Sequence, residues 1–211
     1  MAYGTMIAAM DFSKVDAGEF NDWYDTEHFP ERAATPGFLT AQRWIGVDNP
    51  AQSVVPYDLE SLAVLDGPTY RSYSGDNASP WTRRVTSPVE RMMRYTGVQM
   101  APGDGLAPAE AEGLLVVAMT PSPAVEAGFN TWYDDEHLPA LALVPGVLKA
   151  RRFCSSGGPG LKYVALYHLT GPEVVESAAW KDAAGSTPMP GDIRAGITDR
   201  LRLVCRRYVR G

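Results

Sequence analysis

The sequence predicts an α+β fold in which two consecutive βαββαβ units pack their antiparallel sheets together as one barrel-like core. Three observations predict it. The string FNDWYDTEHFP at residues 20–30 returns as FNTWYDDEHLP at residues 129–139, with eight of the eleven letters identical. Apolar, strand-like segments flank both copies in the same order. A stretch rich in Pro, Ala and Gly, residues 101–112, separates the copies and is typical of a linker.

Each copy predicts the same run of elements. Apolar segments at 3–10 and 113–120 predict the first strands. A helix follows, because Phe20, Trp23 and Tyr24 recur at the spacing of one helical face. The remaining elements are a second strand that carries Arg43 or Arg152, a third strand at 57–65 or 162–169, a weaker and broken helix at about 68–84 or 172–184, and a fourth strand.

Further matches set the expected alignment of the two units. At an offset of 109 residues, Pro36-Gly37 aligns with Pro145-Gly146. LESLAVLDGP at 59–68 then resembles YVALYHLTGP at 163–172 with an offset of 104, and Trp81 and Trp180 fall in comparable places. In this alignment Val64 stands where the second half has His168, so that histidine has no counterpart of its own kind.

The order βαββαβ predicts a four-stranded antiparallel sheet with both helices on one face. The open face of such a sheet must be covered, and a second copy in the same chain supplies the cover. The expected domains are residues 1–100, the linker 101–112 and residues 113–211. The chain is therefore expected to be an intramolecular pseudo-dimer, with further oligomerisation left open.

Composition narrows the classes of partner. The formal net charge is −6, with 45% hydrophobic and 21% charged residues. An acidic chain without a dense basic run argues against nucleic acid and anionic membranes. No signal peptide or membrane span is recognised, so a cytoplasmic protein is expected. Cys154 and Cys205 are the two cysteines, predicted on opposite edges of one sheet, and no metal site is expected.

The repeated helix carries a candidate acid/base set. Tyr24 and Asp25 lie four and three residues before His28, within reach of its imidazole from the preceding turn. A carboxylate beside the ring would raise its pKa, and a phenol could donate to a developing oxyanion. Pro30 predicts a kink just after His28. Tyr133, Asp134 and His137 repeat the set.

Each of these residues also has a structural interpretation. His28 and His137 could cap a helix C-terminus, where a cation suits the helix dipole. Trp23 and Trp132 are expected in the core against the sheet. Finally, Glu27 could pair with Arg43, and Glu136 with Arg152, as helix-to-sheet ion pairs without a catalytic role. His168 is interpreted as a satisfied strand residue, or else as a haem ligand.

The motif F-N-x-W-Y-x-x-E-H-x-P, followed by Pro-Gly, resembles the first-helix signature of the EthD-like branch of the dimeric α+β barrel superfamily. The resemblance covers both halves and implies two ferredoxin-like units. Relatives include cofactor-free monooxygenases, polyketide cyclases, decarboxylases, lactone isomerases, and haem enzymes such as chlorite dismutases. It implies that His28 and His137 act as acid or base in decarboxylation. The chain departs from most relatives in being a tandem fusion.

Two functions follow. The first is an enzyme that needs no cofactor: a lyase or decarboxylase, cyclase, isomerase or monooxygenase acting on a small aromatic or polyketide-like compound, as in aromatic degradation. The alternative is a non-catalytic binding or accessory protein that holds a small apolar molecule, haem included, in the same cleft. The expected catalytic residues are Tyr24, Asp25, His28, Tyr133, Asp134 and His137, and the expected substrate-binding residues are Trp23, Glu27, Arg43, Trp132, Glu136 and Arg152.

Overall fold

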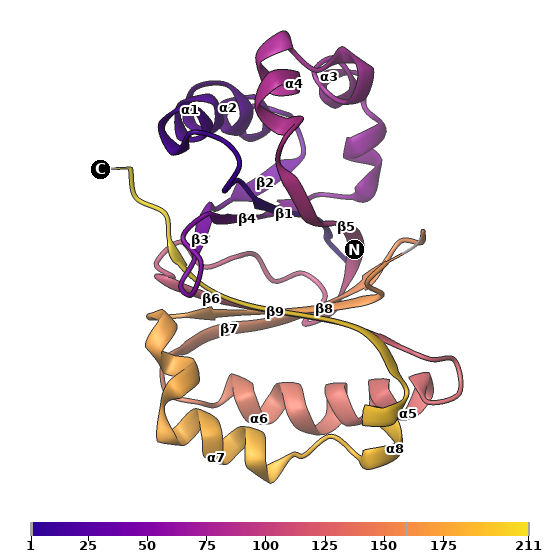
Figure 1. Ribbon diagram of the computed structural model, residues 1–211. Coiled ribbons are helices and arrows are strands. Elements are labelled where there is room, and N and C mark those ends of the chain that lie inside the picture. Colours follow the sequence, from indigo (N-terminus) through magenta and orange to yellow (C-terminus); the bar gives the residue numbers. More distant parts are fainter. Residues whose placement is uncertain (1, 159, 211) are drawn as a thin grey trace.

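Nine antiparallel strands form one closed sheet in the computed structural model, which describes residues 2–158 and 160–210. The helices lie outside this sheet in two layers, one above and one below the barrel in Figure 1. The strands are β1 (Gly4–Asp11), β2 (Phe38–Ala41), β3 (Trp44–Gly46), β4 (Gln52–Leu59), β5 (Glu90–Ala101), β6 (Gly113–Pro121), β7 (Val147–Ser155), β8 (Tyr163–Leu169) and β9 (Ile197–Arg207).

Short helical segments cover each outer face of the sheet. In the first half these are α1 (Ala17–Trp23), a π-helical turn (Tyr24–His28), α2 (Phe29–Ala33), a 3-10 turn (Leu62–Asp66), α3 (Pro68–Arg71), a second 3-10 turn (Gly75–Asn77) and α4 (Pro80–Thr86). In the second half they are α5 (Glu126–Thr131), a π-helical turn (Trp132–His137), α6 (Leu138–Ala142), a 3-10 turn (Pro172–Glu176), α7 (Ala178–Ser186) and α8 (Gly191–Ala195).

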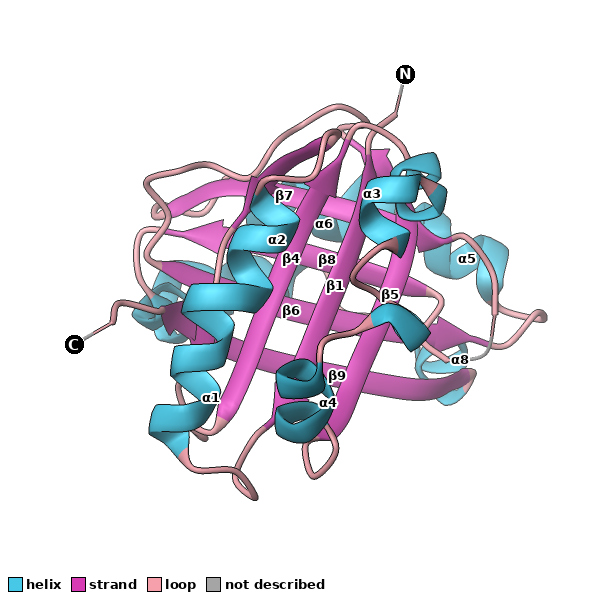
Figure 2. Cartoon of the chain, turned by 90° about the horizontal axis from the view of Figure 1, so that it is seen from above, coloured by secondary structure: helices cyan, strands magenta, loops and turns pink. Residues whose placement is uncertain are grey.

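The two halves have the same strand order and close the barrel together. The order is β5-β1-β4 followed by β2 and β3 in the first half, and β9-β6-β8-β7 in the second. The fourth strand of each half pairs with the second strand of the other, through β5 with β7 and β3 with β9. Seen from above in Figure 2, the strands of the first half cross those of the second. The barrel interior is a single apolar core with residues from both halves, among them Ile7, Val54, Val116 and Leu166.

The alignment expected for the third strands is wrong. Gly4 lies opposite Leu59 and Gly113 lies opposite Leu169, so the corresponding strands are β4 and β8. The first-half strand ends at Leu59, and the residues expected to continue it form the 3-10 turn at Leu62–Asp66. The matching Gly-Pro pairs misled the alignment, because one begins α3 and the other begins a 3-10 turn.

The corrected register changes which residues correspond. Tyr57 corresponds to Tyr167, Asp58 to His168, and Trp180 to Tyr70 rather than to Trp81. The second strand of the first half is also interrupted. Arg43 lies in the short break between β2 and β3, whereas Arg152 lies within β7 as expected. Both cysteines are free thiols.

A buried polar cluster joins the halves inside the barrel. Arg151 donates to the Asp58 carboxylate at 2.5 Å and to the Gly105 carbonyl at 3.0 Å, and its other terminal nitrogen lies 2.9 Å from Nε2 of His168. Asp58 also accepts from the backbone N–H of Ala107 in the expected linker. Burial, and then the charge of Arg151, hold the pKa of His168 well below its usual range. His168 is fully buried beside a cation and lines neither of the two cavities described below, so it does not fit the alternative of a haem ligand. It is only partly satisfied as a strand residue, because its Nδ1 atom has no hydrogen-bond partner among the described residues.

Candidate functional site

A cavity of about 740 Å³ lies between the sheet and the helices of the first half. Its floor consists of Met6, Ala8 and Met10 from β1, Met93 from β5 and Tyr57 from β4. Strand residues two apart point to the same face, which explains why every second residue of β1 reaches the floor. Its walls are Trp23, His28 and Arg32 on one side and Tyr70, Tyr73, Ala78 and Thr82 on the other. The volume lies within the range typical of small-molecule sites.

A π-helical turn positions His28 at this cavity. The backbone N–H of Phe29 bonds to the Tyr24 carbonyl, five residues back, and Pro30 then stands in the first turn of α2. In place of the kink expected at Pro30, the chain has a wider turn just before the proline. Pro30 has no backbone N–H to donate to this turn. Such turns are frequent at functional sites, and this one exposes an imidazole to the cavity.

Aromatic rings surround His28. Its ring centroid lies 4.4 Å from that of Trp23 and 4.9 Å from that of Tyr24. Its Nδ1 atom is buried and has no hydrogen-bond partner among the described residues. Burial, followed by the charges of Arg32 and Arg43, holds the pKa of His28 well below its usual range. The imidazole is therefore neutral at pH 7 and free to accept a proton, and the same burial and charges make it a weaker base than an ordinary histidine.

The expected contact between Asp25 and His28 is wrong, and so is the expected rise in the pKa of the histidine. The Asp25 carboxylate instead accepts from Arg43 at 2.9 Å and from the Tyr208 hydroxyl at 3.0 Å. Arg43 also donates to Asn21. The physical reason is the π-turn, because its wider spacing rotates Asp25 away from the position that an α-helix would give it.

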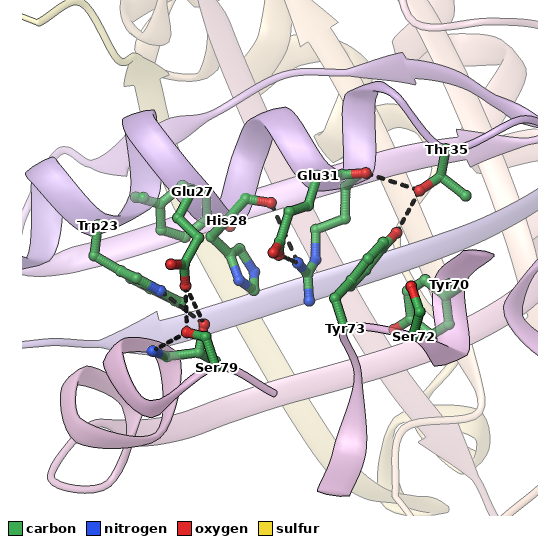
Figure 3. Close-up of polar contacts among 12 residues, drawn as sticks. Trp23, Glu27, His28, Glu31, Thr35, Tyr70, Ser72, Tyr73 and Ser79 are labelled. Carbon is green, nitrogen blue, oxygen red and sulfur yellow. Dashed lines mark hydrogen bonds and ion pairs between the residues drawn. The ribbon is translucent and has the colours of Figure 1, made fainter. Parts of the chain in front are cut away.

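The expected pairing of Glu27 with Arg43 is also wrong. The Glu27 carboxylate accepts from the Ser79 hydroxyl at 2.6 Å (Figure 3). It also accepts from the Thr82 hydroxyl at 2.9 Å. Ser79 is the N-cap of α4, and Thr82 also accepts from the Trp23 indole at 3.0 Å. Glu27 therefore fixes α4 against the π-turn, and in this way it holds the two walls of the cavity together.

Several cavity residues escaped the sequence analysis. Tyr57 lines the cavity, and its hydroxyl is 3.4 Å from that of Tyr24. Burial raises the pKa of Tyr57 well above its usual range, so the phenol keeps its proton. Arg32 donates to the His28 carbonyl at 3.2 Å, and its guanidinium lies 4.8 Å from the ring centroid of Tyr73. The repetition of Tyr57 as Tyr167 was a usable signal that the wrong alignment hid.

The second half has the same motif, but its histidine lies among packed side chains instead of beside an open cavity. Here the ring of His137 stacks on Trp132 at 4.5 Å, and its Nδ1 atom lies 3.0 Å from the Thr187 hydroxyl. Trp180 packs on Tyr167 at 5.4 Å within one apolar cluster that also contains Leu141. Burial lowers the pKa of His137, and hydrogen bonding with the backbone of Thr187 opposes this effect. Neither of the two cavities described here is lined by His137.

Arg152 forms the same anchor as Arg43. It donates to Asp134 and Asn130, each at 2.6 Å, and its guanidinium lies 4.6 Å from the ring centroid of Tyr133. The Tyr133 hydroxyl is 3.2 Å from that of Tyr167, and burial raises its pKa to about 12. The repeated Asn, Tyr and Asp of the motif thus tie the helix to a strand arginine in both halves. Glu136 is exposed and forms no ion pair within the described part of the chain.

Both motif tryptophans are buried, as expected. Trp23 is 0% exposed and Trp132 is 4% exposed. Trp23 also forms part of the cavity wall, so the core and cavity interpretations hold together for this residue.

Solved structures share this fold across nearly the whole chain. A protein provisionally named chlorite dismutase (TA0507) has a TM-score of 0.67 at 12% identity, covering 99% of this chain and 96% of its own. An anthrone oxidase-like protein has a TM-score of 0.65 at 14% identity, covering 99% and 92%. A chlorite dismutase variant from Candidatus Nitrospira defluvii has a TM-score of 0.63 at 10% identity, covering 99% and 93%.

Proteins provisionally named monooxygenases match as well. No family model matches the sequence, and no curated protein matches it. At these identities the likeness establishes the fold alone, an antiparallel barrel with its helices outside.

The expectation that the chain uses no cofactor is contradicted by this comparison. Chlorite dismutases are haem proteins, and their structures have the barrel found here. The fold is therefore one that also occurs in haem proteins.

The histidines of the described chain lack the surroundings of a haem ligand. An iron-ligating imidazole normally donates its other ring N–H to a carboxylate, a carbonyl or water. Nδ1 of His28 is buried without such a partner, and Nδ1 of His137 bonds to Thr187 away from either cavity. The described histidines therefore do not fit an oriented axial ligand.

Two further features bear on partners. Across residues 2–158 and 160–210, every helix is too short or too polar to span a bilayer. The same residues contain no group of three or more His, Cys, Asp or Glu side chains placed to hold a metal ion.

Proposed function

We propose that the chain is an enzyme of the EthD-like branch of the dimeric α+β barrel superfamily, built from two tandem ferredoxin-like units. It binds a small aromatic or polyketide-like molecule in the first-half cavity. The neutral imidazole of His28 takes a proton from that molecule. A single observation carries the proposal: His28 is the motif histidine that lines an open cavity, and burial keeps it unprotonated.

The chemistry follows from the cavity wall. An acidic C–H or O–H of the bound ring gives its proton to the imidazole, and the electron pair left behind moves into the ring and onto its oxygen. Tyr57 keeps its proton because of burial, so its phenol can donate a hydrogen bond to that oxygen. Proton transfer of this kind is common to decarboxylation, cyclisation, isomerisation and oxygenation, and the substrate decides which of them follows.

The likeness to an anthrone oxidase-like protein supplies a probe. The methylene protons of anthrone are acidic because the resulting anion is conjugated with two rings. The wild-type protein is expected to speed the exchange of these protons with D₂O under argon, as measured by proton NMR. His28→Gln should lose this acceleration, and His137→Gln should keep most of it.

The result that overturns the proposal is an exchange rate in His28→Gln equal to that of the wild type. If all three proteins bind anthrone and none speeds exchange, the chain is a non-catalytic binding protein. An absorption spectrum of the purified protein accompanies the assay, because a Soret band would show bound haem and redirect the assignment.

A further inference from the structure

Four arginines line the first-half cavity, namely Arg32, Arg83, Arg91 and Arg94. None of its lining residues is Asp or Glu. The whole chain carries a formal charge of −6, so this gathering of positive charge runs against the average of the molecule. Clefts lined by one sign of charge concentrate ligands of the other sign.

Three of these charges have no carboxylate partner within the described residues. Arg94 donates to the Tyr70 hydroxyl at 3.2 Å and lies 3.8 Å from the sulfur of Met6, and both groups are neutral. Arg83 donates to a backbone carbonyl. Arg32 differs, because it pairs with Glu31 at 3.0 Å.

Arg94 and His28 both line this cavity and are connected through its wall. A chain of contacts runs from Arg32, beside His28, to Tyr73 at 4.8 Å, from Tyr73 to Tyr70 at 5.5 Å between ring centroids, and from the Tyr70 hydroxyl to Arg94. Arg94 is exposed on β5, so a charged group bound there keeps part of its hydration. A desolvated anion would be costly deeper in the cavity, among the methionines.

We infer that the cavity selects aromatic molecules that carry a carboxylate. Arg94 binds the carboxylate at the mouth, and the ring lies on the methionine floor beside His28. The guanidinium fork matches a planar carboxylate through paired hydrogen bonds. The inference rests on the proposed function for the role of His28, but the recognition of the carboxylate stands apart from that role.

The repeat offers a matched control. Arg94 lies opposite Ala8 on β1, and Arg202 lies opposite Val117 on β6, which is the same place in the second half. Arg202 lines neither described cavity. Arg94→Gln and Arg202→Gln therefore remove the same charge from equivalent exposed strand positions, with and without a cavity beside them.

The test compares anthracene-9-carboxylate with its neutral carboxamide, by calorimetric titration of the full chain. The wild type is expected to bind the carboxylate about tenfold more tightly than the carboxamide, as for one charge-assisted pair. Arg94→Gln should reduce this ratio to near one without weakening carboxamide binding, while Arg202→Gln should leave the ratio unchanged. Thermal melts of both variants check that the fold is kept.

Equal affinity of the wild type for the two probes overturns the inference, and so does a preference that survives in Arg94→Gln. Failure of the proposed function looks different. If the carboxylate preference is present but His28→Gln exchanges anthrone protons at the wild-type rate, the recognition stands and the catalytic role of His28 falls. If neither probe binds, the carboxylate inference falls, and the anthrone exchange assay alone decides the proposed function.

Discussion

The Nδ1 atom of His137 lies 3.0 Å from the Oγ1 atom of Thr187, and this contact distinguishes the two copies of the motif. The equivalent nitrogen of His28 has no partner among the described residues, and the ring faces a cavity. The histidine of the repeated eleven-residue string thus has a hydrogen-bond partner for Nδ1 in the second half and none among the described residues in the first. The difference comes from the neighbouring helices, because α7 continues to Ser186 while α3 ends at Arg71.

This difference predicts opposite effects of the two histidine substitutions on stability and activity. His137→Ala is expected to lower the free energy of unfolding by about 1 kcal/mol more than His28→Ala does, because it loses a hydrogen bond in addition to a stacked ring. Urea denaturation measures the two free energies. The accelerated exchange of anthrone protons with D₂O should instead be lost in His28→Ala and kept in His137→Ala. Equal stabilities of the two variants would show that the Thr187 contact adds nothing.

Arg32 is predicted to lower the pKa of His28 through its charge. Its counterpart in the second half is Leu141, so Arg32→Leu replaces one repeat residue with the other. Removal of the cation should raise the pKa of His28, since the Arg32 charge is the second cause of its depression after burial. NMR titration of the His28 ring protons measures this shift, with the His137 ring as an internal control. An unchanged or lower pKa of His28 would contradict the prediction.

The fold could be predicted from the sequence because the characteristic segments occur twice, once in each half. Two copies of an aromatic helix string and matching first strands define the units, and the need to cover a sheet face defines the barrel. The third strands were misaligned because LDGP and LTGP match in letters while Tyr57 and Tyr167 match in space. Short apolar strands carry too little periodicity to choose between such registers.

The site was only partly readable, for a different reason. Helical spacing placed Asp25 beside His28, but a π-turn gives another rotation, and nothing in the letters distinguishes it from an α-turn ahead of a proline. Arg32 and Tyr57 reach the cavity through tertiary packing, which the spacing of residues does not encode. The asymmetry between the halves was visible in Glu31-Arg32 against Ala140-Leu141, but only the structure connects it with an open cavity.

Acid is predicted to destabilise the protein through its buried histidines. The pKa values of His28 and His168 lie well below the usual value of 6.5 in the folded chain. Below about pH 6.5 the unfolded chain binds more protons than the folded one, so the free energy of unfolding falls as the pH drops, by up to about 1.4 kcal/mol per pH unit for each such group. The contribution of the neutral His28 and His168 to stability is complete above about pH 6.5.

His168→Gln tests the sign of this dependence. Glutamine can still accept from Arg151 but does not titrate. Urea denaturation at several pH values between about 7 and 5 should give a shallower loss of stability than in the wild type. A parallel pH dependence in the two proteins would mean that His168 is not held neutral in the fold.

The ion pair between Asp58 and Arg151 is predicted to matter more than the one between Asp25 and Arg43. The side chains of Asp58 and Arg151 are 1% and 0% exposed, while that of Asp25 is 22% exposed. Asp58→Ala leaves a buried guanidinium without its counter-charge, which typically costs about 3–5 kcal/mol of stability. Asp25→Ala leaves Arg43 with Asn21 and the face of Tyr24, so a smaller loss of about 1–2 kcal/mol is expected.

Urea denaturation of the two variants measures the two losses of stability. Asp58→Ala combined with Arg151→Met should recover part of the loss, because the double variant removes the buried charge that Asp58→Ala leaves unpaired. A loss in Asp58→Ala no larger than in Asp25→Ala would mean that the barrel interior does not isolate Arg151 from water.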